Sequence, residues 1–336
     1  MSTIWEVKSN IVYEMCCFLN ALCVGLPYSK YYTVDRAYWL AKLMADGKID
    51  SLKAIKRLIY TERKQIISSE LCLYFSMIND EDPEVKDVLK INSKKLSDMR
   101  KTERVFWVSE NWDAFVMALP EIKKVFKSLL ENGFIEYFGS KYQFSLSEKC
   151  KAVKEEIREF DIISPIEDIC KKEFTNNKVK LYICHFTLPH GMKLYGNRFI
   201  GMSTISTTTL AWLSLHEMIH TPYSYDKGIR DILESMKKNS KISNAVMNHE
   251  KWIGYNTFES YFNEQCTKAL DHFLGEKIGI IPNDAVGSSV IERAKKDDGG
   301  IHILFPRIYR LLKMKYDYSE SFQEFIVRMY RETLLL

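Results

Sequence analysis

The chain has 336 residues, of which 46% are hydrophobic and 27% are charged, and this composition is typical of a globular protein rather than a disordered one. The net charge of +4 is too small an excess for the concentrated basic face of a nucleic-acid-binding domain, so we expect no nucleic-acid partner. The length exceeds what a single hydrophobic core usually needs and predicts two domains.

The eight cysteines are irregularly spaced, form no CxxC pair and mostly stand among apolar residues. This pattern is typical of buried, reduced thiols and indicates a cytoplasmic protein. Residues 11–26 form an apolar run, but Glu14 interrupts it and no basic segment precedes it. The run is too short for a membrane span, so we expect an amphipathic core helix and no signal peptide.

Hydrophobic spacing in the N-terminal half predicts a series of helices that ends at Asn132-Gly133. The expected helices are 4–22, 34–46, 51–78, 83–98 and 112–130. Two strand-like runs, 134–138 and 141–146, then flank Gly139-Ser140, and a helix at 147–160 follows. This order is compatible with a winged-helix module. We favour a helical domain with one hairpin, because basic residues are not concentrated on a helix that could enter a DNA groove.

A polar turn at Ser164-Pro165 predicts a boundary between a helical domain, 1–163, and a second domain, 164–336. The second domain should begin with a buried strand at 179–186 and a hairpin formed by 192–195 and 198–205. A helix capped by Ser206 or Thr207 should follow, and the remaining chain looks mostly helical. The predicted fold class is α+β, predominantly helical, with a small mixed sheet.

The helix expected after the hairpin contains the sequence HEMIH at 216–220. Side chains four residues apart lie on one face of a helix, so His216 and His220 can reach the same metal ion. Zinc lowers the pKa of water, and Glu217 stands where a carboxylate can accept the proton. A surface helix with two incidental histidines is the alternative. Apolar neighbours such as Leu213 and Ile219 disfavour it, because they bury part of the helix.

This arrangement resembles the zincin metallopeptidases, in which a strand precedes an HExxH helix and a third metal ligand comes from further along the chain. The resemblance covers residues 179–275 at most. Within it, Asn263-Glu264 is similar to the Asn-Glu pair of the gluzincin group, where the glutamate completes a zinc site from a second helix. The resemblance therefore implies Zn²⁺ as cofactor, a zincin-like catalytic domain and Glu264 as the third ligand.

Two features depart from the gluzincin pattern. Glu264 follows His220 by 44 positions, a longer separation than in compact members. Lys268 stands where many members carry an acidic residue that supports a ligand, and Asp271, two turns from Glu264, is expected to be a weak substitute.

Two other carboxylates remain candidates for the third ligand. Glu259 is expected on the apolar side of the same helix, where an unpaired carboxylate would be costly unless it bound something. Asp226 follows His220 by six residues, a spacing that resembles metzincin-like sites with a terminal aspartate. That group has a glycine at the position that Tyr223 occupies here.

A metallopeptidase also needs a donor that stabilises the oxyanion. Tyr255 is the first choice, with Tyr223 and Tyr225 as alternatives. The predicted function is a zinc metallopeptidase that acts on a peptide or protein substrate. Two alternatives remain open: a zincin-fold binding protein without catalysis, and a zinc amidohydrolase that is not a peptidase. The presence of Glu217 favours an enzyme, because metal binding alone would not need a base there.

Overall fold

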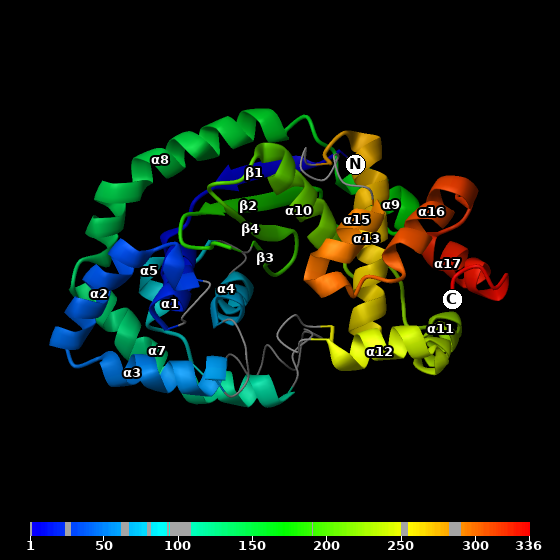
Figure 1. The fold of residues 1–336 in the computed structure, drawn as a ribbon. Helices are drawn as coiled ribbons and strands as arrows, with labels where there is room; N and C mark the ends of the chain where they lie inside the picture. Colours follow the sequence, from blue (N-terminus) through cyan, green and yellow to red (C-terminus); the bar gives the residue numbers. More distant parts are fainter. Residues whose placement is uncertain are drawn as a thin grey trace. The chain divides into compact units, whose positions relative to one another are not determined.

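The computed structural model describes residues 2–23, 28–61, 67–78, 82–92, 94, 109–189, 191–249, 255–281 and 290–336. The fold is predominantly helical with one four-stranded mixed sheet, which confirms the predicted α+β class (Figure 1). None of the helices in these ranges is both long and apolar enough to cross a bilayer.

Contacts divide the chain into two units that are not continuous in sequence. The unit that we call the C-terminal unit consists of Met1–Trp5, Glu156–Lys178 and Ser206–Leu336. The unit that we call the N-terminal unit consists of Glu6–Glu155 and Val179–Ile205. The strand and hairpin that we assigned to the second domain thus group with the N-terminal half.

The sheet contains β1 (Ile4–Lys8), β2 (Lys178–Cys184), β3 (Met192–Lys193) and β4 (Arg198–Met202), in the order β1-β2-β4-β3. Strand β2 pairs parallel to β4, and β3 pairs antiparallel to β4. The predicted strand at 179–186 and the hairpin around Gly196-Asn197 are therefore confirmed. The prediction of helix from residue 4 is wrong, because Ile4–Lys8 pairs in the sheet and the first helix begins only at Ile11.

The N-terminal unit contains most of the remaining predicted helices. Its elements are α1 (Ile11–Cys23), η1 (Tyr28–Lys30), α2 (Thr33–Ala45), α3 (Ile49–Ile55), η2 (Lys56–Thr61), α4 (Ile67–Ile78), α5 (Val85–Val88), α7 (Ser109–Glu131) and α8 (Phe134–Ile157). The helix expected at 83–98 is wrong directly beyond Val88, because residues 89–92 are not helical. Other parts of it, and part of the helix expected at 51–78, lie outside the described residues. All eight cysteines of the chain are buried, and none forms a disulfide.

The hairpin predicted at 134–146 is wrong, because this segment belongs to the long helix α8 (Figure 1). The residues that α8 buries are spaced at helical intervals, and they are Phe134, Phe138, Leu146, Cys150, Val153 and Ile157. The short runs FIEYF and KYQFSL alternate with a period of two, but the apolar pattern over the whole segment has a helical period. A winged-helix module is thereby excluded for this segment.

The C-terminal unit is almost entirely helical. Its elements are α9 (Ile163–Cys170), α10 (Thr207–Ile219), α11 (Lys227–Lys238), α12 (Ser240–Asn248), α13 (Phe258–Ile278), α15 (Val290–Lys296), η4 (Asp297–Gly300), α16 (Phe305–Lys315) and α17 (Phe322–Arg331). Helix α13 packs against both α10 and α16 (Figure 1). Every residue from Tyr261 to His272 is buried, so α13 is enclosed on all sides and lies in the core of this unit.

Candidate metal centre

Helix α10 positions the two histidines of the HEMIH sequence. Ser206 caps the helix, and its side chain accepts a hydrogen bond of 3.1 Å from the backbone N–H of Thr209. His216 lies in the last turn, and His220 is the C-cap residue. Their Nε2 atoms are 3.2 Å apart. Two nitrogen ligands of a tetrahedral zinc ion, each bonded at about 2.0–2.1 Å, would be separated by roughly 3.3 Å, so this spacing fits a shared metal ion.

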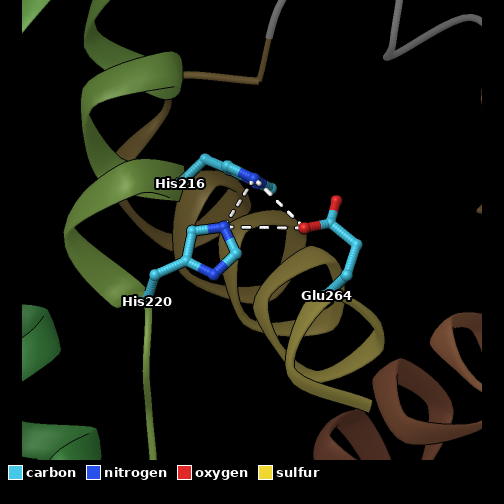
Figure 2. A group of neighbouring side chains, drawn as sticks. All are labelled: His216, His220 and Glu264. Carbon is cyan, nitrogen blue, oxygen red and sulfur yellow. Dashed lines mark hydrogen bonds and ion pairs between the residues drawn. The ribbon is translucent and has the colours of Figure 1, made fainter. Parts of the chain in front are cut away.

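Helix α13 brings Glu264 to the same point (Figure 2). Its Oε2 atom lies 3.5 Å from His220 Nε2 and 3.8 Å from His216 Nε2. Among the described residues, these three side chains form a group whose ligand atoms all lie within 4.8 Å of one another. Glu264 is only 3% exposed, and a carboxylate buried to this degree requires compensating charge or hydrogen bonds.

A hydrogen bond to α13 orients His216. Its Nδ1 atom lies 2.6 Å from Oδ2 of Asp271, a carboxylate that is completely buried. This bond places the proton of the neutral ring on Nδ1 and leaves the Nε2 lone pair free for a metal. The expectation that Asp271 is a weak substitute is therefore wrong, because it supports His216 directly.

His220 also has its Nδ1 atom against α13. Asn263 Nδ2 lies 3.0 Å away, and Thr267 Oγ1 lies 3.2 Å away. The Asn263 Oδ1 atom is buried and has no hydrogen-bond partner among the described residues. Turning this amide by 180° would let Oδ1 accept a proton from Nδ1, which is the tautomer that a metal on Nε2 requires. The orphaned oxygen therefore fits a metal-bound His220.

The carboxylates give the site a negative potential. Burial by itself lowers the pKa of His216, but the charge of Glu264 and the hydrogen bond to Asp271 outweigh it and raise the pKa to about 9. Charges that attract a proton to this imidazole also attract a metal cation to it.

Glu217 and Tyr255 lie close to the three ligand candidates. Glu217 is half-buried, and its charge acts on both His216 and Tyr255. Burial, reinforced by the charge of Glu264 and a hydrogen bond with that carboxylate, raises the pKa of Tyr255. Tyr255 therefore stays protonated beside Glu264 and can act as a hydrogen-bond donor.

The alternative ligand candidates lie elsewhere. Asp226 caps helix α11: Oδ1 accepts a hydrogen bond of 2.9 Å from the N–H of Ile229, and Oδ2 accepts one of 2.7 Å from Gln323. Glu259 lies in the first turn of α13 and is absent from the three-residue group. Five residues separate it from Glu264, so its side chain leaves the helix in a different direction.

The alternative tyrosines belong to a packed aromatic cluster. Tyr223 is 3% exposed, and its ring lies 5.5 Å from that of Phe262 and 5.7 Å from that of Tyr225. Tyr223 is thus a core tyrosine, whereas Tyr225 is 43% exposed. Of the three tyrosines considered as donors, Tyr255 is the one that hydrogen-bonds the candidate third ligand.

Sequence reasoning undervalued Asp271 and did not consider Thr267. Asp271 follows Glu264 by seven residues, or about two helical turns, so both side chains leave α13 on the same side. His216 pairs with Asp271, and His220 pairs with Thr267. The two histidines are one turn apart on α10, and their two partners are one turn apart on α13. This helical spacing was the signal available in the sequence.

Searches against family profiles, curated proteins and solved structures find no match for this chain. The assignment of the site therefore depends on its residues and their geometry.

Proposed function

We propose that this protein is a zinc-dependent hydrolase that cleaves peptide bonds. The observation that carries the proposal is the convergence of His216, His220 and Glu264 on one point, with Glu217 beside it. Two imidazoles and one carboxylate are the ligand set of catalytic zinc sites that keep a fourth position open for water or substrate. A site meant only to hold the ion structurally is usually closed by four protein ligands.

The buried partners of the histidines support a bound metal ion. An imidazole whose other nitrogen is bonded to a carboxylate is the arrangement that raises ligand basicity in zinc sites. His216 has such a partner in Asp271, at 2.6 Å. A bound zinc ion would supply Lewis acidity, which lowers the pKa of a neighbouring water and polarises a substrate carbonyl.

Two residues of the chain would then act in proton transfer and hydrogen bonding to the substrate. Glu217 is not one of the three ligand candidates, so its carboxylate remains available to accept a proton from the attacking water and deliver it to the leaving amine. Tyr255 would donate its hydroxyl proton in a hydrogen bond to the oxyanion that develops on the substrate carbonyl. The hydrogen bond between Tyr255 and Glu264, one of the three ligand candidates, supports this role.

The test combines metal analysis with cleavage of a mixed peptide library. We expect one equivalent of zinc per chain after loading and loss of that zinc in a His216→Ala/His220→Ala variant. We also expect the zinc-loaded protein to cleave peptides and the zinc-free protein not to. Zinc binding without cleavage of peptides, but with hydrolysis of small amides, would make the protein an amidohydrolase. Zinc binding without any hydrolysis would make it a binding protein, and no zinc at all would refute the proposal.

A further inference from the structure

Lys268 is a buried cation beside the proposed metal centre. Its ammonium Nζ lies 3.9 Å from Glu264 Oε1, and its side chain is 10% exposed. The other oxygen of the same carboxylate, Oε2, faces the two histidine Nε2 atoms. The two oxygens of Glu264 thus have different neighbours, a cation on one side and the metal position on the other.

The position of Lys268 is fixed by a second carboxylate. Its Nζ donates a hydrogen bond of 2.8 Å to Oδ2 of Asp297, the first residue of η4. Asp297 Oδ2 also lies 3.6 Å from Arg293 Nη2. The guanidinium of Arg293 lies over the ring of Trp212 on α10, 4.5 Å from its centroid, and Arg293 is 7% exposed. Asp297 is therefore held by two buried cations, one of which is packed against the helix that carries the histidines.

A lysine is electrostatically unfavourable next to a site that binds a cation. A positive charge near a divalent ion repels it, so Lys268 is expected to lower metal affinity if charge alone matters. The ion pair with Asp297 offsets the cost of burying Lys268, but it does not explain a positive charge 3.9 Å from a carboxylate that would bind the metal. The different neighbours of the two Glu264 oxygens suggest a role for it.

We propose that Lys268 is a positioning residue that restricts Glu264 to one-oxygen coordination and so keeps the metal four-coordinate. The inference rests on the proposed function. With Oε1 attracted to the ammonium, only Oε2 is free to bind the metal. Without that attraction, the carboxylate can turn so that both oxygens bind and occupy space that water and substrate need. Lys268 thereby preserves the open position that catalysis uses.

Cobalt(II) substituted at the site gives a direct readout, because its visible absorption is intense in four-coordinate sites and weaker when a fifth ligand is added. We expect cobalt-loaded Lys268→Met to absorb less strongly than the wild type. Lys268→Arg, which keeps the charge, should retain the wild-type spectrum. Lys237→Met provides a matched control, because Lys237 pairs with Glu234 on α11 at the surface. Asp297→Asn, which loosens the anchor, should give an intermediate spectrum.

Zinc affinity, measured by chelator competition, separates positioning from structural support. The affinity of Lys268→Met should equal or exceed that of the wild type, since a repulsive charge is gone and a ligand atom is gained. Weaker zinc binding with an unchanged cobalt spectrum would overturn the inference. If Lys268→Met does not fold, an unchanged spectrum in Asp297→Asn would overturn it equally. A wild-type protein that binds neither metal would refute the proposed function itself, which distinguishes the two failures.

Discussion

At the scale of single residues, the site separates groups that would bind the metal from groups that would do chemistry. The three ligand candidates converge, and Glu217, which directly follows His216 in the chain, is not part of the group. The separation can be tested because ligand loss and base loss have different consequences. A ligand variant should fail to hold the metal, whereas a base variant should hold it and fail to turn over.

For Glu217→Gln we expect hydrolysis to fall by about 10²–10⁴-fold, the usual contribution of a general base. The amide is nearly the same size as the carboxylate but cannot accept the proton. Zinc content should remain at one equivalent per chain, as measured by metal analysis beside turnover of a confirmed substrate. Wild-type turnover in this variant would refute the role assigned to Glu217.

Glu264→Ala should weaken zinc binding strongly, by more than the ~10–100-fold that follows from losing a hydrogen-bond partner of a ligand. Glu259→Ala and Asp226→Ala should bind zinc like the wild type, because neither side chain belongs to the three-residue group. Chelator competition on the three variants decides between them. Asp226→Ala is also expected to lower stability by about 1 kcal/mol, since it removes the N-cap of α11.

Asp271→Asn should reduce zinc affinity by roughly 10–100-fold without abolishing binding. The asparagine oxygen can still accept the hydrogen bond from His216 Nδ1, but it no longer supplies the negative charge that makes the imidazole a stronger ligand. The measurement is the same chelator competition, with Asp231→Asn on α11 as a matched control. Equal affinities for Asp271→Asn and the wild type would show that this buried carboxylate does not support the metal.

At the scale of elements, substitutions at two glycines test whether residues 134–146 form a helix, as in the structure, or a hairpin. Gly139 is exposed within α8, and a Cβ added there would meet no atom within 4 Å. Gly133, just before α8, has a φ of +80°, a conformation that L-residues rarely adopt. The two glycines therefore predict opposite responses to the same substitution.

Gly139→Ala should stabilise the protein by about 0.5–1 kcal/mol, because alanine loses less backbone entropy than glycine when a helix forms. Gly133→Ala should destabilise it by roughly 1–2 kcal/mol, since alanine is strained in the left-handed region. Denaturant unfolding of both variants gives the comparison. Destabilisation by Gly139→Ala would instead favour a turn at this position.

At the scale of the whole molecule, the chain forms two units, and all three ligand candidates lie in the C-terminal unit. They come from two helices, α10 and α13, that pack together and are joined by a long stretch of chain. A metal that binds only the folded arrangement stabilises it in proportion to its occupancy.

Zinc at 100 times its dissociation constant should raise the free energy of unfolding of the C-terminal unit by about 2.7 kcal/mol. Thermal unfolding with and without zinc measures this, and a chelator should reverse the shift. The His216→Ala/His220→Ala variant should show no zinc-dependent shift. A shift of equal size in that variant would place the stabilising metal elsewhere in the protein.

The sequence by itself determined the features that depend on local spacing. The four-residue separation of His216 and His220, the cap at Ser206 and the hairpin around Gly196-Asn197 are encoded within a few residues, because helical and turn geometry are local. Glu264 was instead predicted from the resemblance of Asn263-Glu264 to the Asn-Glu pair of the gluzincin group, with Glu259 and Asp226 left open as alternatives. Residues 134–146 fit both a strand-like and a helical spacing of apolar residues, and the predicted hairpin was wrong there.

Only the tertiary structure decided which distant groups meet. The hydrogen bonds that His216 donates to Asp271 and that Lys268 donates to Asp297 depend on how α13 packs against α10 and η4. The grouping of residues 179–205 with the N-terminal half likewise depends on long-range contacts, such as the two backbone N–H groups of His185 and Phe186 that donate to buried Glu14. Such contacts leave no periodic trace in a single sequence, because their partners are separated by tens to hundreds of residues and are selected by packing of the whole core.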